Sequence, residues 1–116
     1  MDEVIKATVL GVAETFATTM REFVEQQKML NQTKFDLARR ERQLLADITN
    51  QKDVNGKDSF SSDVKRKAEL SARKDIDAGY QHLVDLHGSA EDTIAETKTV
   101  LEVCKFNMKA YDIITR

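Results

Sequence analysis

Hydrophobic side chains recur every three or four positions along residues 3–50, and this spacing predicts one long helix. Several of them lie seven residues apart, as they do along the contact line between packed helices, here called the seam. The predicted seam consists of Ile5, Val9, Val12, Phe16, Met20, Phe23, Leu30, Leu37, Leu44 and Ile48. The three-four alternation continues only if Gln27, Lys34 and Glu41 also occupy seam positions. Around Phe16 two successive spacings of four residues, from Val12 to Met20, predict a local stutter.

Residues 77–116 carry a second hydrophobic line with an unbroken three-four alternation, which predicts a second long helix. A stripe of this kind is most simply the core of a helix-packing contact. Its seam consists of Tyr80, Leu83, His87, Ala90, Ile94, Thr97, Leu101, Cys104, Met108 and Tyr111.

Residues 51–76 separate the two long helices and hold the clearest turn in the chain. Asn55-Gly56 predicts this turn, because both residue types tolerate positive φ. A short helix is expected to follow and to end at about Lys74. Either Ser61 or Ser62 is expected to cap the N-terminus of this short helix. Either Asp75 or Asp77 is expected to cap the long helix that follows it.

Two long helices joined by so short a segment should fold back on each other. The sequence therefore predicts an all-α fold, an elongated antiparallel helical hairpin of coiled-coil type with a short helix at its tip. We expect a single domain over residues 1–116, and the absence of Pro agrees with long uninterrupted helices. The periodicity leaves open whether the long helices pair within one chain or between two chains.

The end of the predicted hairpin that holds both termini is apolar and open. If Tyr80 lies beside Ile48, then Tyr111 lies near Phe16. The residues before about position 10 then extend beyond the end of the second long helix. An apolar end of this kind predicts a homo-oligomer, a dimer or higher. The predicted interface consists of Val4, Ile5, Val9, Leu10, Phe106, Ile113 and Ile114.

The formal net charge of −2 conceals an uneven distribution. Residues 39–74 contain ten basic and six acidic residues, which gives +4, while the remainder carries −6. Such polarity can direct one end of a molecule toward DNA or a DNA-bound protein, although basic helical faces are commonly just solvated. The candidate site consists of Arg39, Arg40, Arg42, Lys57, Lys65, Arg66, Lys67, Arg73 and Lys74, with Phe60 placed to stack on a base.

The side chains offer no set that predicts catalysis, so we do not expect an enzyme. His82 and His87 are five residues apart and point in different directions on a helix, which does not suit a metal pair. Cys104 lies in the seam, where a small buried apolar side chain is its simplest role. The sequence therefore predicts neither a metal site nor a cofactor.

The N-terminal residues lack the basic and apolar regions of a signal peptide, and no apolar run reaches the roughly 20 residues of a membrane helix. We therefore expect no membrane partner. A single cysteine excludes a disulfide within the chain and suits a reducing compartment. The expected location is the cytoplasm.

The run Asn55-Gly56-Lys57-Asp58-Ser59-Phe60-Ser61-Ser62, followed by Arg66, Leu70 and Tyr80-Gln81-His82-Leu83, resembles a family of small phage and prophage proteins. In that family a long helix precedes an Asn-Gly-Lys and aromatic-Ser-Asn turn, and a basic helix and a coiled-coil helix follow. The resemblance spans roughly residues 44–112, and Ser62 stands where the family usually has Asn. It implies the bacterial cytoplasm and, by analogy, a role in DNA recombination or replication.

Two functions remain open at this point. The first is a non-enzymatic phage accessory protein in DNA recombination or replication, which oligomerises and contacts DNA or another protein through the basic tip. The second is a protein-only interaction module, such as an inhibitor of a host defence system or an assembly adaptor. Polar interruptions in the seams favour the second, because they leave partial faces that a partner helix can complete.

Overall fold

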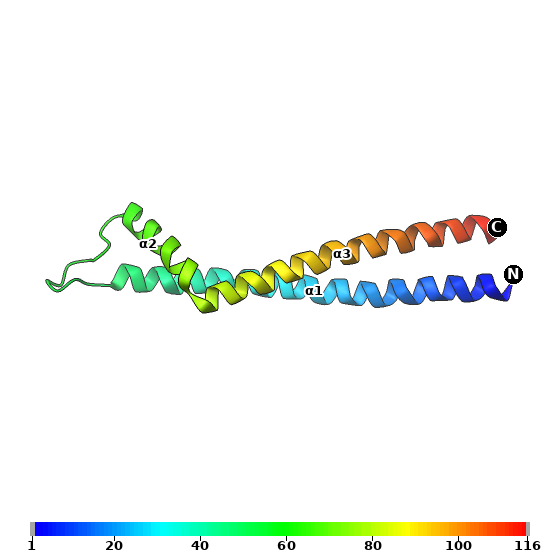
Figure 1. Ribbon diagram of the computed structural model, residues 1–116, viewed down its shortest axis with the longest axis horizontal. Coiled ribbons are helices and arrows are strands. Elements are labelled where there is room, and N and C mark those ends of the chain that lie inside the picture. Colours follow the sequence, from blue (N-terminus) through cyan, green and yellow to red (C-terminus); the bar gives the residue numbers. More distant parts are fainter. Residues whose placement is uncertain (1, 116) are drawn as a thin grey trace. The chain divides into compact units, whose positions relative to one another are not determined.

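The described part of the chain, residues 2–115 of a computed structural model, contains three helices in succession (Figure 1). Helix α1 spans Glu3–Asn50, α2 spans Asp63–Ile76 and α3 spans Ala78–Thr115. Side chains are described up to residue 113. The predicted all-α helical hairpin, with a short helix between two long antiparallel ones, is confirmed.

The chain divides into two compact units, and both long helices pass through both of them. The terminal unit pairs the first part of α1, up to residue 30, with α3 from residue 89 onward. The loop unit comprises residues 31–88, which hold the end of α1, the connecting loop, α2 and the start of α3.

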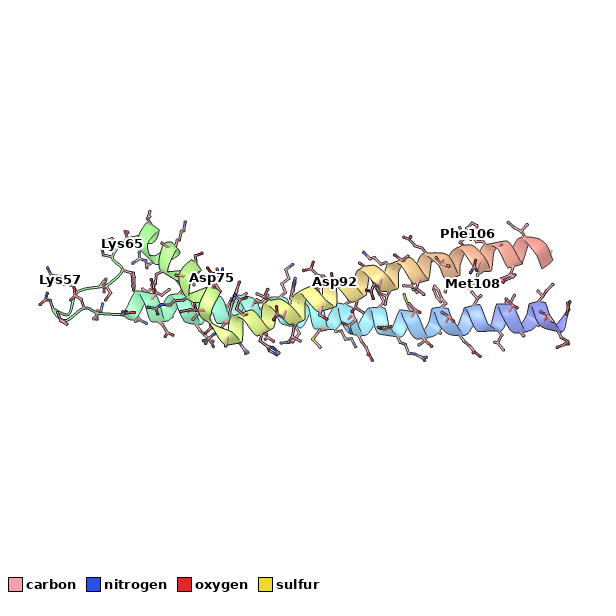
Figure 2. All side chains as sticks on the ribbon, viewed as in Figure 1. Lys57, Lys65, Asp75, Asp92, Phe106 and Met108 are labelled. Carbon is pink, nitrogen blue, oxygen red and sulfur yellow. The ribbon has the colours of Figure 1, made fainter. Side chains whose placement is uncertain are left out.

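The buried side chains of the terminal unit come mostly from α3. Along α3 the predicted seam is confirmed, because each of its ten positions is buried or half-buried. Figure 2 shows Met108 on the side of α3 that faces α1, whereas Phe106 points away from α1. The buried residues of this unit are Thr19, Ala90, Ile94, Thr97, Leu101 and Cys104.

The seam of α1 differs from the prediction at two positions, where threonines replace larger neighbours. Thr19 and Thr33 are buried, with 9% and 2% exposure, whereas Met20 is 43% exposed and Lys34 is exposed. Threonine can occupy such a position because it presents a methyl group to the opposite helix while its hydroxyl can bond within its own helix. With Thr19 in the seam the steps on the two sides of Phe16 are four and three residues, so the predicted stutter at Phe16 is wrong.

In the loop unit, apolar burial is concentrated on α1. Leu44 and Ile48 are its buried apolar side chains, with 6% and 0% exposure. Helix α2, although described throughout, contributes no buried residue. Polar contacts, rather than apolar burial, must therefore hold much of α2 in place.

Both helices that follow the loop begin at a capped residue. The Ser62 hydroxyl accepts a hydrogen bond from the backbone N–H of Lys65 at 3.2 Å, so the second of the two candidate serines caps α2. Asp77 ends α2 and begins α3: its N–H donates to the carbonyl of Arg73 at 2.9 Å, and its carboxylate accepts from the N–H of Tyr80 at 2.7 Å. Of the two candidate aspartates, Asp77 is therefore the cap.

The predicted turn at Asn55-Gly56 is confirmed. The N–H of Gly56 donates to the carbonyl of Asp53 at 3.0 Å, and the Asp53 carboxylate accepts from the N–H groups of Asn55 at 2.8 Å and Lys57 at 3.0 Å. Gly56 has φ +76°, in the left-handed region that favours glycine, while Asn55 keeps a negative φ. The loop is thus folded around one aspartate and one glycine.

Replacing Gly56 by alanine is expected to destabilise the protein by about 1 kcal/mol, because a Cβ is disfavoured at this φ. The matched control is Gly88→Ala, which lies in α3 with no atom within 4 Å of an added Cβ. This second change should stabilise by up to about 1 kcal/mol. Urea unfolding followed by circular dichroism measures both, and shifts of the same sign would contradict the prediction.

Candidate interaction surfaces

A bidentate ion pair joins α1 to the junction of α2 and α3. Arg40 Nε donates to Asp77 Oδ2 at 2.9 Å, and Arg40 Nη2 donates to Asp77 Oδ1 at 2.6 Å. These bonds, followed by the one from the Tyr80 N–H, lower the pKa of Asp77 to about 2. Arg40, one of the candidate site residues, is therefore occupied inside the loop unit.

Arg73 of α2 links three parts of the loop unit. Its Nε donates to Glu69 Oε1 at 2.9 Å, and its Nη2 donates to the Gln51 side-chain oxygen at 2.6 Å. The guanidinium lies 5.8 Å from the centroid of the Phe60 ring, at cation–π distance. The half-buried Phe60, predicted to stack on a base, is thus packed against a residue of its own chain.

Two further basic residues of α2 also have partners nearby. Arg66 Nη2 donates to Asp63 Oδ1 at 2.8 Å, which lowers the pKa of that carboxyl, and Nη1 donates to the Phe60 carbonyl at 3.3 Å. Lys74 Nζ lies 3.3 Å from a carboxylate oxygen of Glu41 on α1. These contacts attach α2 to the loop before it and to α1 beside it.

The candidate basic residues therefore fall into two groups. Arg39, Arg40, Arg66, Arg73 and Lys74 each form an ion pair with a carboxylate of this chain. The exposed remainder, which forms no ion pair within the described residues, consists of Arg42, Lys57, Lys65 and Lys67. Those four come from three elements, α1, the loop and α2, so the positive charge still available to a partner is spread over the unit.

In the terminal unit, most of the predicted oligomer interface is at the surface. Val4, Leu10, Phe106 and Ile113 have exposures of 70%, 60%, 72% and 71%. Ile5 and Val9 are half-buried on the seam side of α1, and the side chain of Ile114 lies outside the described residues.

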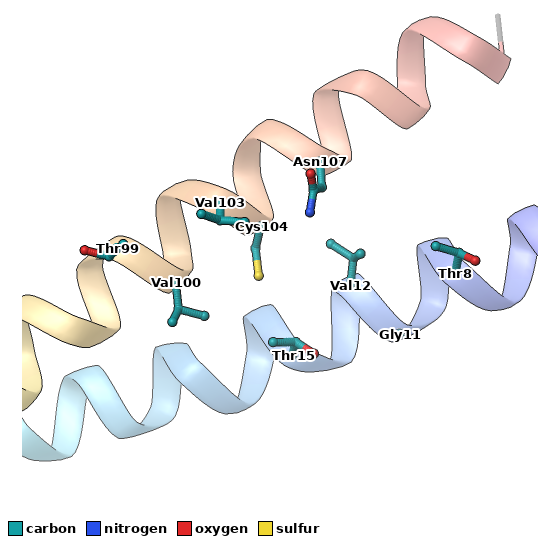
Figure 3. A pocket seen from close by; sticks show the side chains of 9 residues that line it. All are labelled: Thr8, Gly11, Val12, Thr15, Thr99, Val100, Val103, Cys104 and Asn107. Carbon is teal, nitrogen blue, oxygen red and sulfur yellow. The ribbon is translucent and has the colours of Figure 1, made fainter.

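A groove that the sequence did not predict lies along one side of the terminal unit, between α1 and α3 (Figure 3). Its volume is about 540 Å³, and none of its nine lining residues is charged. The lining residues are Thr8, Gly11, Val12, Thr15, Thr99, Val100, Val103, Cys104 and Asn107. This set is called the uncharged groove below.

A second apolar stripe runs along another side of α1. It explains why Met20 resembles a seam residue in the sequence: Met20 belongs to a parallel line with its own three-four spacing. That line consists of Leu10, Ala13, Ala17, Met20 and Val24, and all five are exposed. The hollows beside it have charged rims, formed by Arg21, Glu25, Lys28, Lys98, Glu102 and Lys105.

The histidine and cysteine side chains do not form a common site. His82 is exposed, His87 is half-buried and Cys104 is buried in the seam. Within residues 2–115 there is no group of three His, Cys, Asp or Glu side chains that could hold a metal ion. In the same range no helix combines the length and hydrophobicity that a membrane span requires.

At the level of class, these features define a coiled-coil-type helical hairpin that exposes large apolar side chains, most of them in the terminal unit, and forms ion pairs in the loop unit. Comparison with protein-family models, curated proteins and solved structures finds no match to this chain.

Proposed function

We propose that this chain is a non-enzymatic helical interaction module that self-associates through its terminal unit. The observation that carries the proposal is the exposure of large apolar side chains there, such as Phe106 at 72% and Ile113 at 71%. Soluble monomers rarely leave clustered apolar side chains of this size in water. A role in phage DNA recombination or replication, suggested by the sequence resemblance, stays a prediction.

The direct test is the mass of the protein in solution, by light scattering at tens of micromolar. We expect a dimer or higher assembly, and Phe106→Ser should shift the mass toward the monomer. Val54→Ser is a suitable control, because Val54 is an exposed apolar residue as well but lies in the loop. A wild-type protein that remains monomeric would contradict self-association.

A second candidate function, contact with a polyanion such as DNA, is favoured by the basic residues that form no ion pair within residues 2–115. Lys57, Lys65 and Lys67 are exposed, and each could neutralise a backbone phosphate. Arg66 and Arg73 are less suitable for testing this, since reversing them would also break contacts that hold α2 and the loop. The test must therefore change only the unpaired lysines.

Binding of short single- and double-stranded DNA, measured by fluorescence anisotropy between about 50 and 200 mM salt, tests this candidate. The variant K57E/K65E/K67E should lose most of the affinity and of its salt dependence. The matched control K6E/K28E/K109E changes the net charge equally, on exposed lysines of the terminal unit. Equal losses in both variants would indicate non-specific attraction.

A protein partner captured from cells, whose binding survives nuclease treatment and high salt, would instead favour the protein-only function.

A further inference from the structure

We infer that the uncharged groove of the terminal unit is the surface on which a second copy of this chain docks, an inference that rests on the proposed self-association. The two walls of the groove differ at Gly11. On α1 this residue leaves a gap between Thr8 and Thr15, whereas α3 presents Val100 and Val103 (Figure 3).

The absence of charge decides what kind of partner the groove suits. All nine lining residues are neutral, so the groove offers no charge to pair with a phosphate or with a charged peptide side chain. The cores of protein interfaces are depleted in charged residues in the same way. The hollows beside the other stripe of α1 differ, because Lys98, Glu102 and Lys105 form part of their rim.

The same face is complementary to itself under a two-fold axis parallel to the helices. Such an axis stacks α3 of one copy on α1 of the other, antiparallel. A rotation about this axis does not change the height of a residue along it, so residues at the same height within one chain also meet between the two copies. Val12 and Cys104 line the same groove, so they lie at about the same level. The turn of α3 around Val103 would then meet α1 of the second copy near Gly11, and the four helices would form a bundle.

Gly11 supports this arrangement. It lies inside α1 with an ordinary helical φ, and a Cβ added there would meet no atom within 4 Å. Glycine weakens a helix relative to alanine, and packing within the chain does not require it at this position. A second helix approaching closely would use the missing side chain, and Val103 on the opposite wall, which is 54% exposed, is a side chain that this contact could cover.

The size of the face indicates a weak dimer. Residues 4–18 of α1 extend about 20 Å, and a face two helices wide is also about 20 Å across. The contact would cover on the order of 400 Å² on each copy, about half of the roughly 800 Å² per partner that a standard specific interface buries. We therefore expect a dissociation constant in about the micromolar range rather than the nanomolar.

Sedimentation equilibrium of the full chain over a micromolar concentration series tests the assignment. Gly11→Leu should weaken dimerisation at least about tenfold, because the added side chain occupies the place of the second copy. The matched control Ala17→Leu adds bulk to the exposed stripe on another side of α1 and should leave the dissociation constant within about twofold. Circular dichroism must show unchanged helicity in both variants.

The outcomes separate the docking surface from the proposed function. A wild-type chain that is monomeric throughout the series overturns both. A wild-type dimer that Gly11→Leu leaves intact, or that Ala17→Leu weakens equally, overturns the groove assignment while self-association stands. A loss specific to Gly11→Leu, reproduced by Val103→Ser, supports the groove.

Discussion

Replacing Ile48 by alanine is expected to lower the free energy of unfolding by about 3 kcal/mol, the largest effect of any single truncation in the loop unit. Ile48 has 0% exposure, and it is the largest fully buried side chain among the described residues. Removing its three outer carbons therefore forfeits apolar burial and leaves a cavity. Urea unfolding followed by circular dichroism gives the difference directly.

The chain offers a matched control for this substitution. Ile76→Ala removes the same atoms from the end of α2, where the side chain is 84% exposed, and should change stability by no more than about 0.5 kcal/mol. Comparable losses in the two variants would mean that burial of Ile48 is not what stabilises the loop unit. The expected contrast is large because Leu44 is the other buried apolar residue of the unit, so no extensive core compensates for the lost contact.

The seams show how far the fold could be predicted from the sequence. The line from Tyr80 to Tyr111 was predicted completely, because apolar or small residues mark every position except His87. On α1 the position at Thr19 was missed, since its neighbour Met20 is the more hydrophobic of the two. The structure shows that α1 has two adjacent apolar stripes, and periodicity alone does not say which of them α3 covers.

The basic cluster shows why the candidate site was harder to predict. The sequence supplies the count of charges, but partners such as Arg40 and Asp77 are 37 residues apart and meet only through the fold. Helical angle matters as well: Arg42 follows Arg40 by two positions and so lies about 200° around α1. The sequence could not separate cations that hold the loop unit together from those left for a partner, because that depends on tertiary distance.

Changes at Asp77 are expected to affect stability in a pH-dependent way, because this residue combines two roles. Its carboxylate pairs with Arg40 and also caps α3 through the N–H of Tyr80. Asp77→Asn keeps an oxygen that can cap the helix but removes the ion pair, whereas Asp77→Ala removes both. The melting temperature at neutral pH should therefore fall on the order of 5 °C for the asparagine variant and further for alanine.

The pH dependence distinguishes the charge from the cap. The pKa of Asp77 is lowered from 3.8 to about 2 in the folded chain, so the unfolded chain takes up the proton first as the solution is acidified. The stabilisation from the ion pair is therefore fully present above about pH 4 and lost as the pH falls through about 2. The melting temperatures of wild type and Asp77→Asn should converge over this interval, with that of Asp77→Ala remaining lower throughout.

The control Asp75→Asn, on an exposed carboxyl two residues away, should follow the wild type. A gap between wild type and Asp77→Asn that persists unchanged at pH 2 would assign the effect to packing or capping rather than to the Arg40 pair.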